Sequence, residues 1–391
     1  MQKSIILLIL LLLCSFSMQG QSAERMPGRL SDSAFASVLT CGPGDEFYES
    51  FGHSALRICD STQGLDVVFN YGTFDFSEPH FYLRFAGGRL NYLVTTESLG
   101  GFWLEYSYFG RSVYEQRLRL SKSELDTLFK MLVINLRPEN RYYKYDFFRD
   151  NCATRIWDMV AAALKGRSLP PDDYPDTKQT YRDLVYKYTD STLLWWRLGV
   201  DLLLGANCDH VMTKSQYAYI PTEMMWQLDT LLLTDGEALA EPSAQMLDET
   251  RQSLPRSVSP TMCFWILFAI VLIITLMARR VKWKLYWLDG IVYTAVCAVS
   301  LLLIYMTFFS DHWCTKANFN LLWANPLYMW LLVRLRHQNR VMTLLIGCVL
   351  LAFLVGFSMW PQSFNSAVIP IVLTLEVRLL DRFTDKKKYK L

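Results

Sequence analysis

The last third of the chain contains a series of long apolar runs, which constrain the fold more than any other feature of the sequence. The composition changes abruptly after Pro260, where residues 261–278 form an almost uninterrupted apolar stretch that is closed by basic residues at 279–284. A helix that crosses a bilayer needs about 20 mostly apolar residues. Further apolar runs follow at 286–309, 321–335, 341–357 and 364–380. The sequence therefore predicts an all-α membrane domain over residues 259–391, with about five transmembrane helices.

The distribution of lysine and arginine between these runs predicts the orientation of the chain. The basic segments 279–284, 334–340 and 378–390 fall on one side of the predicted membrane domain. The loops on the other side, 310–320 and 359–363, carry a single lysine between them. Because loops rich in lysine and arginine face the cytoplasm, we expect a cytoplasmic C-terminus and an N-terminal domain outside the cytoplasm.

The N-terminal part of the chain has the pattern of an exported domain. Residues 1–22 contain a short basic start, an apolar centre and a small, polar end, which are the three parts of a secretory signal. Between residues 23 and 258 no apolar run approaches the length of a membrane span, and charged residues recur throughout. We therefore predict a signal peptide at 1–22 and an exported domain at 23–258.

Charge and cysteine spacing exclude two classes of protein. The 39 basic residues balance 37 acidic ones, so the chain lacks the basic excess of a nucleic-acid-binding protein, and we expect no nucleic acid as partner. The nine cysteines include no C-x-x-C pair, which excludes a zinc ribbon and a dense disulfide scaffold. No metal site is predicted, and a single disulfide among Cys41, Cys59 and Cys208 stays open.

The exported domain combines predicted strands with predicted helices, which indicates an α+β fold. Segments 54–58 and 65–71 are expected to form an antiparallel hairpin, and 89–96 and 112–120 alternate like further strands. Residues 122–136 have helical spacing, and a second helix is expected to begin at Cys152.

Cys152 and His53 are the candidates for a catalytic pair. Cys152 follows Asp150 and Asn151, either of which can cap the helix that begins there. The free N–H groups and the positive dipole end of a helix N-terminus favour a thiolate over a thiol. His53 follows a glycine at the start of a strand, from where its imidazole can face the helix terminus and accept the thiol proton.

A catalytic imidazole also requires a partner that fixes its tautomer. In the predicted hairpin the start of the first strand lies beside the end of the second, which brings Asn70 near His53. Asp66 is the reserve candidate for the same role. The backbone N–H groups at Cys152 can form an oxyanion hole.

Several residues are predicted to support the site or bind substrate. Arg149 and Arg155 flank the candidate nucleophile and could lower its pKa or bind a lipid phosphate, or simply lie on the solvated surface. The polar loop 310–320 is either a wet loop at the membrane edge or holds a lipid head group through His312, Lys316, Asn318 and Asn320. Two further helical segments, 191–204 and 215–233, carry aromatic residues that belong either to the core or to an interfacial belt.

Three motifs give the chain a resemblance to known families. Residues 51–58 read Phe-Gly-His-Ser-Ala-Leu-Arg-Ile, 70–72 read Asn-Tyr-Gly, and 145–152 read Tyr-Asp-Phe-Phe-Arg-Asp-Asn-Cys. A histidine that precedes the cysteine resembles the circularly permuted papain-like thiol enzymes, the group that includes lecithin:retinol acyltransferase. More narrowly, the motifs resemble those of the Lnb family of bacterial lipoprotein N-acyltransferases. His312 and residues 318–327 look like the membrane-edge motif of that family.

This resemblance implies a permuted papain-like domain in the periplasm, joined to a multi-pass domain in the bacterial inner membrane. It also implies an enzyme that moves an acyl chain from a phospholipid to the N-terminal amine of a diacylated lipoprotein. In that reaction the Cys152 thiolate attacks the phospholipid ester, a thioester forms, and the lipoprotein amine attacks the thioester. His53 acts first as base and then as acid. No cofactor is implied.

Two other functions remain open at the level of the sequence. The same cysteine and histidine could serve a membrane-anchored thiol peptidase or amidase that acts on cell-wall peptide. From a different class, the chain could be a non-catalytic membrane protein that binds lipoproteins or polysaccharide. A function that stays intact after Cys152→Ser or Cys152→Ala would favour the binding protein.

Overall fold

The computed structural model describes residues 26–175, 178–189, 192–251, 257–337 and 340–384, so the predicted signal peptide lies outside the described residues. The chain divides into two compact units, which are described separately below. Unit 1 comprises residues 1–178 and 212–253, and unit 2 comprises residues 179–211 and 254–391. Whereas the sequence placed 23–258 in one domain, the segment 179–211 belongs to unit 2 in the structure.

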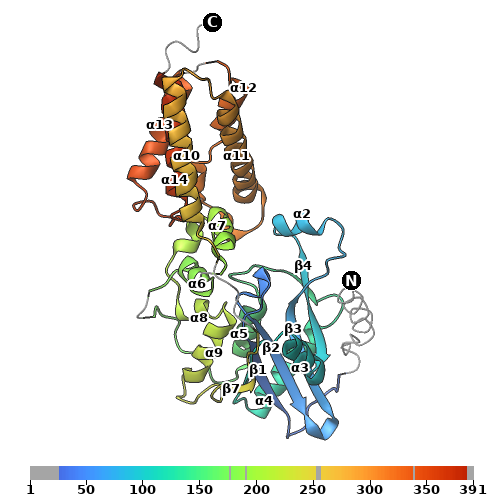
Figure 1. The fold of residues 1–391 in the computed structure, drawn as a ribbon. Coiled ribbons are helices and arrows are strands. Elements are labelled where there is room, and N and C mark those ends of the chain that lie inside the picture. Colours follow the sequence, from blue (N-terminus) through green and yellow to red (C-terminus); the bar gives the residue numbers. More distant parts are fainter. Residues whose placement is uncertain (1–25, 176–177, 190–191, 252–256, 338–339, 385–391) are drawn as a thin grey trace. The chain divides into compact units, whose positions relative to one another are not determined.

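Unit 1 is built on a seven-stranded antiparallel sheet with the order β6-β4-β3-β2-β1-β5-β7 (Figure 1). The predicted hairpin is confirmed, because β2 pairs with β3 and aligns Ala55 with Asn70. The predicted strands near 89–96 and 112–120 are β4 and β5. The strands are β1 (Phe35–Cys41), β2 (His53–Asp60), β3 (Leu65–Thr73), β4 (Asn91–Ser98), β5 (Val113–Arg117), β6 (Tyr142–Lys144) and β7 (Ala244–Leu247).

Alternation of side chains along the strands gives the sheet two buried faces. Leu56, Ile58 and Phe69 lie in a large core together with α4, α5 and α9, whereas Ala55 and Val68 lie in a smaller core with α3. The expected helices at 122–136 and from Cys152 onward are α4 and α5. The helices of unit 1 are α2 (Phe81–Ala86), α3 (Leu99–Tyr108), α4 (Lys122–Asn135), α5 (Cys152–Ala163), α8 (Lys214–Tyr217) and α9 (Pro221–Thr230).

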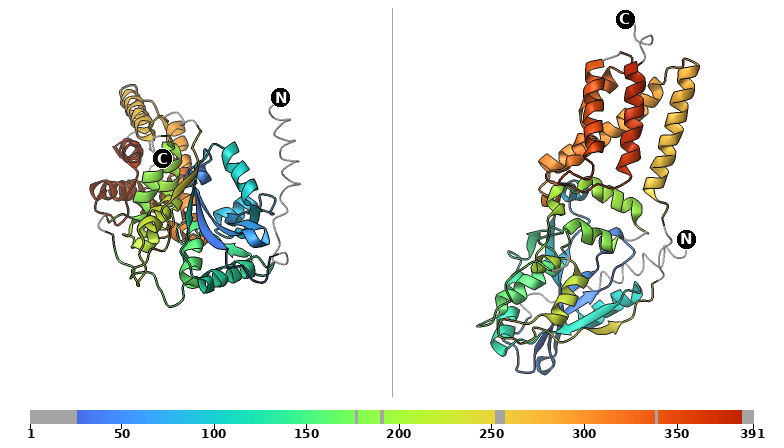
Figure 2. Two further views of the ribbon diagram at one scale, coloured as in Figure 1. Left: turned by 90° about the horizontal axis from the view of Figure 1, so that it is seen from below. Right: turned by 90° about the vertical axis from the view of Figure 1, so that its left-hand side faces the viewer.

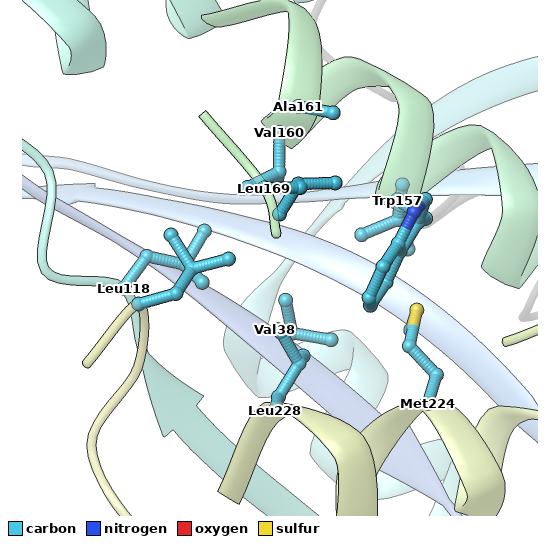
Figure 3. A pocket seen from close by; sticks show the side chains of 10 residues that line it. Val38, Leu118, Trp157, Val160, Ala161, Leu169, Met224 and Leu228 are labelled. Atoms are coloured by element: carbon cyan, nitrogen blue, oxygen red, sulfur yellow. The ribbon is translucent and has the colours of Figure 1, made fainter. Parts of the chain in front are cut away.

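The large core holds α5 firmly in place. Figure 3 shows a cavity behind the helix, where Trp157 and Val160 of α5 face Val38 of the sheet and Met224 of α9. All the lining side chains are apolar, and the cavity measures about 10 Å³, which is at most the space of one water molecule. This cavity is too small for an acyl chain, and its walls serve to fix the helix that carries Cys152.

Unit 2 contains apolar helices that are long enough to span a membrane. α10 has 21 residues and therefore rises about 31 Å, and residues 286–309 form a second candidate span. Figure 2 shows that α14, in red, packs against both α10 and α13. The helices are α6 (Tyr181–Tyr188), α7 (Leu194–Leu203), α10 (Pro260–Arg280), α11 (Tyr286–Ile304), α12 (Leu327–Val333), α13 (Arg340–Val355) and α14 (Val368–Thr384).

The third apolar run of the sequence does not form one long helix. It is divided between a short 3-10 turn at Phe319–Leu322 and the seven-residue helix α12, which rises only about 10 Å. Residues 323–326 separate the two pieces, and the Asn325 side chain accepts a hydrogen bond from the N–H of Leu327 at 3.1 Å. A local turn therefore interrupts the run that the hydropathy of the sequence made continuous.

Candidate active site

Cys152 is the first residue of α5, and Asn151 is its N-cap. The Asn151 Oδ1 accepts hydrogen bonds from the N–H groups of Ala153 and Thr154, both at 2.9 Å. Its Nδ2 donates to the carbonyls of Phe147 and Tyr219 at 2.8 and 2.7 Å. Asn151 thus uses both ends of its amide to fix the helix start, which accounts for the Asn-Cys pair in the sequence.

The Cys152 thiol is buried among backbone donors. Burial raises the pKa of the Cys152 thiol, while hydrogen bonds from the backbone N–H groups of Ser54, Ala153 and Cys152 itself lower that pKa. The sulfur is therefore a thiol at rest, placed where three N–H groups would stabilise a thiolate. The same donors could stabilise an oxyanion that forms beside the sulfur.

The two central strands separate where α5 meets the sheet. The paired register of β2 and β3 stops at Ala55 and Asn70, and Gly72 has a φ of 94°, which favours glycine. A Cβ atom at Gly72 would lie 3.9 Å from the Cβ of Cys152. The cysteine therefore lies at the end of the β2–β3 pair, where its sulfur accepts a hydrogen bond from the N–H of Ser54, the residue after His53.

His53, Asn70 and Glu97 form a hydrogen-bonded chain across three adjacent strands. The His53 Nε2 lies 3.2 Å from the Asn70 Oδ1, and the Asn70 Nδ2 donates to the Glu97 Oε1 at 2.7 Å. A carboxylate only accepts hydrogen bonds, so it requires the Asn70 nitrogen to face Glu97 and the oxygen to face His53. The neutral imidazole then carries its proton on Nε2, which leaves Nδ1 as the basic nitrogen.

The protonation states of His53 and Glu97 favour proton transfer near neutral pH. Burial lowers the pKa of His53 to about 4, so the imidazole is neutral and can act as a base. Burial raises the pKa of Glu97 to about 7, and the nearby charge of Glu105 on α3 contributes to that rise. Glu97 therefore gains or loses its negative charge near pH 7, and with it the acceptor that orients the Asn70 amide toward His53.

Arg111 places a buried positive charge near the site. Its Nε donates to the carbonyl of Gly42 at 2.9 Å, and its Nη1 contacts Glu49 at 3.1 Å. Gly42 follows Cys41, which pairs with His53 in the sheet. The charge of Arg111 lowers the pKa values of both Cys152 and His53, which stabilises the thiolate and the neutral imidazole.

The other predicted residues of unit 1 have partners elsewhere. Asp66 binds Arg57 through both carboxylate oxygens, at 2.7 and 2.8 Å, and does not bind His53. Arg149 forms an ion pair with Asp146 at 2.9 Å. Arg155 binds Asp150 at 2.6 Å, and its guanidinium lies over the ring of Tyr143. The structure brings His53 and Asn70 together as expected and shows Asp66, Arg149 and Arg155 in ion pairs.

The predicted membrane-edge residues take part in contacts within unit 2. Asn318 donates to the carbonyls of Leu202 and Leu203 at 2.8 and 3.1 Å, and Asn320 donates to the same end of α7. The carbonyl of His312 accepts a hydrogen bond from the Thr315 hydroxyl at 3.0 Å. The two asparagine amides thus bind the last turn of α7, where carbonyl groups lack partners within the helix.

Two site residues were not found from the sequence. Glu97 and Arg111 are charged residues in or beside strands, and no motif marks them, because their roles depend on which strands are neighbours.

The free cysteines include Cys41, Cys59 and Cys208. Within the described residues, no group of three or more His, Cys, Asp or Glu side chains is placed to hold a metal ion.

Comparison with known proteins identifies the family. The model of the Lnb N-terminal periplasmic domain matches residues 28–187, and the model of the Lnb transmembrane domain matches residues 250–389. No curated protein and no solved structure matches the chain significantly. The two family models together span most of the chain and follow each other in the expected order. The chain therefore belongs to the Lnb family and is a membrane protein with a periplasmic domain.

Proposed function

We propose that the chain transfers an acyl chain from a membrane phospholipid to the N-terminal amine of a diacylated lipoprotein, through a thioester on Cys152. Membership of the Lnb family suggests an enzyme that modifies lipoproteins. The observation that carries the proposal is the Cys152 thiol at the start of α5, which accepts a hydrogen bond from the N–H of Ser54. Ser54 directly follows His53, the first member of the His53–Asn70–Glu97 network. Such an arrangement is suited to acyl transfer, in which a nucleophile, a base and an oxyanion site act together.

The first half-reaction forms the acyl-enzyme. His53 Nδ1 accepts the thiol proton while the Cys152 sulfur attacks the carbonyl carbon of the phospholipid ester. The N–H groups near the sulfur stabilise the negative oxygen of the tetrahedral intermediate. When the intermediate collapses, the ester C–O bond breaks and the imidazolium gives its proton to the departing lysophospholipid alcohol. The product is a thioester on Cys152.

The second half-reaction regenerates the thiol. The lipoprotein amine attacks the thioester carbonyl, and His53 accepts a proton from the amine nitrogen. The C–S bond then breaks, an amide is formed, and the proton returns to the Cys152 sulfur. Each half-reaction begins with His53 as a neutral base, which agrees with its lowered pKa of about 4. No cofactor takes part.

The proposed reaction is accompanied by a proposal for the fold of the periplasmic domain and for the membrane topology. We infer a permuted papain-like domain, because the histidine on a strand precedes the cysteine at a helix start. We also propose about five membrane segments in the bacterial inner membrane, of which the third is interrupted before α12, with the periplasmic domain ending near residue 258. In this interpretation both substrates are lipid-anchored, so an enzyme that is itself held in the membrane meets them at the bilayer surface.

The test measures the mass of a lipoprotein N-terminal peptide from cells in which the wild type or one variant is the only copy of this protein. We expect the N-acyl increment with the wild type and with Cys208→Ala, which replaces a buried cysteine outside the proposed site. The increment should be absent with Cys152→Ala and with His53→Ala. An increment that persists in Cys152→Ala would refute the proposed function. Cleaved cell-wall peptide in place of the increment would favour the amidase.

A further inference from the structure

Unit 1 exposes an apolar surface on and beside α2. Tyr82 and Leu83 are 79% and 70% exposed, and Phe76 and Phe85 are exposed as well. These four residues are called the α2 surface below. Large exposed apolar side chains that lie together usually mark a contact with a partner or a membrane.

The α2 surface lies at the same end of the sheet as the proposed site. β3 ends at Thr73 and β4 begins at Asn91, so the connection that carries α2 leaves the sheet there. β2, which is antiparallel to β3, begins at His53 at that same end. Figure 1 shows α2 beyond the end of β4. Strand order and direction thus bring the α2 surface and the catalytic end of the sheet to one side of unit 1.

A row of aromatic rings connects the α2 surface with the neighbourhood of Cys152. The inward-facing Phe81 of α2 lies 5.9 Å from the ring of Phe74, which lies 5.3 Å from Tyr92. Tyr92 stacks on Tyr145 at 4.3 Å. A Cβ atom at Gly72 would lie 3.7 Å from the Tyr145 ring and 3.9 Å from the Cβ of Cys152. The apolar contacts are therefore continuous from the exposed helix to the proposed nucleophile.

We propose that the α2 surface inserts into the periplasmic leaflet of the bilayer, and that the aromatic row guides a phospholipid acyl chain to Cys152. The chain is a membrane protein, so a bilayer is available as the partner of an exposed apolar surface. α2 combines three aromatic rings and a leucine with Arg84, which forms an ion pair with Glu78 before the helix at 2.8 Å. Aromatic residues are enriched at membrane interfaces. The guidance of an acyl chain rests on the proposed function, whereas the lipid contact does not.

The lipid contact can be tested without any reaction at Cys152. The full-length chain is reconstituted in vesicles of phosphatidylethanolamine and phosphatidylglycerol, with a photoreactive benzoylphenylalanine in place of Leu83 or Leu104. Leu104 lies on α3 and is 71% exposed, so it is a matched control. We expect a covalent phospholipid adduct at position 83 and little or none at 104. No lipid adduct at position 83, or equal adducts at both, would overturn the proposal, as would an adduct with a lipoprotein alone.

The second test separates the capture of lipid from the chemistry. The double variant Tyr82→Ser/Leu83→Ser is compared with Leu104→Ser/Tyr108→Ser, which removes the same residue types from α3. We expect the first variant to raise the KM for a vesicle-bound phospholipid donor by about tenfold, with unchanged acylation of Cys152 by a soluble short-chain ester. Equal losses with both donors would overturn the proposal, because α2 would then be structural. If the wild type is acylated by neither donor, the proposed function fails, and the photoreaction still decides the lipid contact.

Discussion

Each unit contains a cluster of polar groups, and the two clusters differ in how completely their hydrogen bonds are satisfied. The unit 1 cluster is the proposed site, with Cys152, His53, Asn70, Glu97 and Arg111. The unit 2 cluster consists of Arg182, Asp201, Asp209, Asn318 and Asn320. In unit 2, Arg182 donates through Nε and Nη2 to Asp209 and through Nη1 to Asp201, and Nη2 also reaches the carbonyls of Leu204 and Gly205. In unit 1, the Nη2 of Arg111 has no hydrogen-bond partner among the described residues. A saturated cluster fixes the backbone around it, whereas an unsaturated one keeps donors that a substrate can use.

The asparagines of the two clusters show the same difference. Asn318 and Asn320 of unit 2 bind main-chain carbonyls, which do not change their charge between pH 4 and 10. Asn70 of unit 1 instead bridges two titratable side chains, His53 and Glu97. The hydrogen bonds of Asn318 and Asn320 therefore do not depend on protonation, while those of Asn70 do.

The largest effect is expected from the nucleophile of the unit 1 cluster. Cys152→Ala should lower the rate of acyl transfer by about 10⁴-fold or more, because no other group can form the thioester. The free energy of unfolding should change by about 1 kcal/mol, the usual size for one small side chain. Single-turnover mass spectrometry measures the thioester, and thermal unfolding measures stability. Normal turnover by the variant would show that unit 1 does not use its cluster for covalent chemistry.

The unit 2 cluster should respond in the opposite way. Arg182→Leu leaves the buried carboxylate of Asp201 and the partly buried one of Asp209 without their cation, which should cost about 3–5 kcal/mol of stability. Acyl-enzyme formation per folded molecule should stay unchanged. The control is Arg29→Leu, which removes an exposed arginine that is 3.9 Å from Asp126 and should cost less than about 1 kcal/mol. Thermal unfolding in detergent compares the two variants. Equal stability of both would mean that the unit 2 cluster is not structural.

Glu97 should set the pH dependence of the reaction. The pKa of its carboxyl group is raised to about 7, so the fraction of carboxylate that orients Asn70 increases between pH 6 and 8. The wild-type rate should rise over that range, because the pKa of His53 lies below it and that of Cys152 above it. Glu97→Gln should remove the rise and lower the rate at pH 8 by about tenfold, or 1.4 kcal/mol.

The control for this pH profile is Asp66→Asn, which changes a carboxylate of the same sheet that binds Arg57 instead of Asn70. Its rate should still rise between pH 6 and 8. Stopped assays across the pH range compare the three proteins. A rise that survives in Glu97→Gln would assign the titration to another group.

The smallest effect concerns single hydroxyl groups. The buried Oγ1 of Thr40 has no hydrogen-bond partner among the described residues, whereas that of Thr189 in unit 2 donates to the carbonyl of Val185 at 2.6 Å. Thr40→Val should therefore leave stability unchanged or raise it by up to about 1 kcal/mol, and Thr189→Val should lower it by about 1 kcal/mol. Equal losses in thermal unfolding would show that Thr40 is satisfied in solution.

Much of the site was predictable from local sequence. Asn151 and Cys152 were expected at a helix start because capping depends on neighbours in the chain. The pairing of His53 with Asn70 followed from a short hairpin, whose register is local as well. Glu97 was not predictable in this way, because β4 reaches Asn70 only through the order of the strands in the sheet.

The sequence alone determined which parts of the chain are apolar enough for a membrane, which cysteine and histidine are the candidates for catalysis, and which family motifs they belong to. Only the tertiary structure decided that Arg111 and Glu97 approach the site, that Asn318 and Asn320 bind α7, and that the third apolar run is interrupted. The physical reason is that hydropathy, capping and hairpin pairing act over a few residues. Buried charges and polar side chains, in contrast, are satisfied by partners that can lie a hundred residues away.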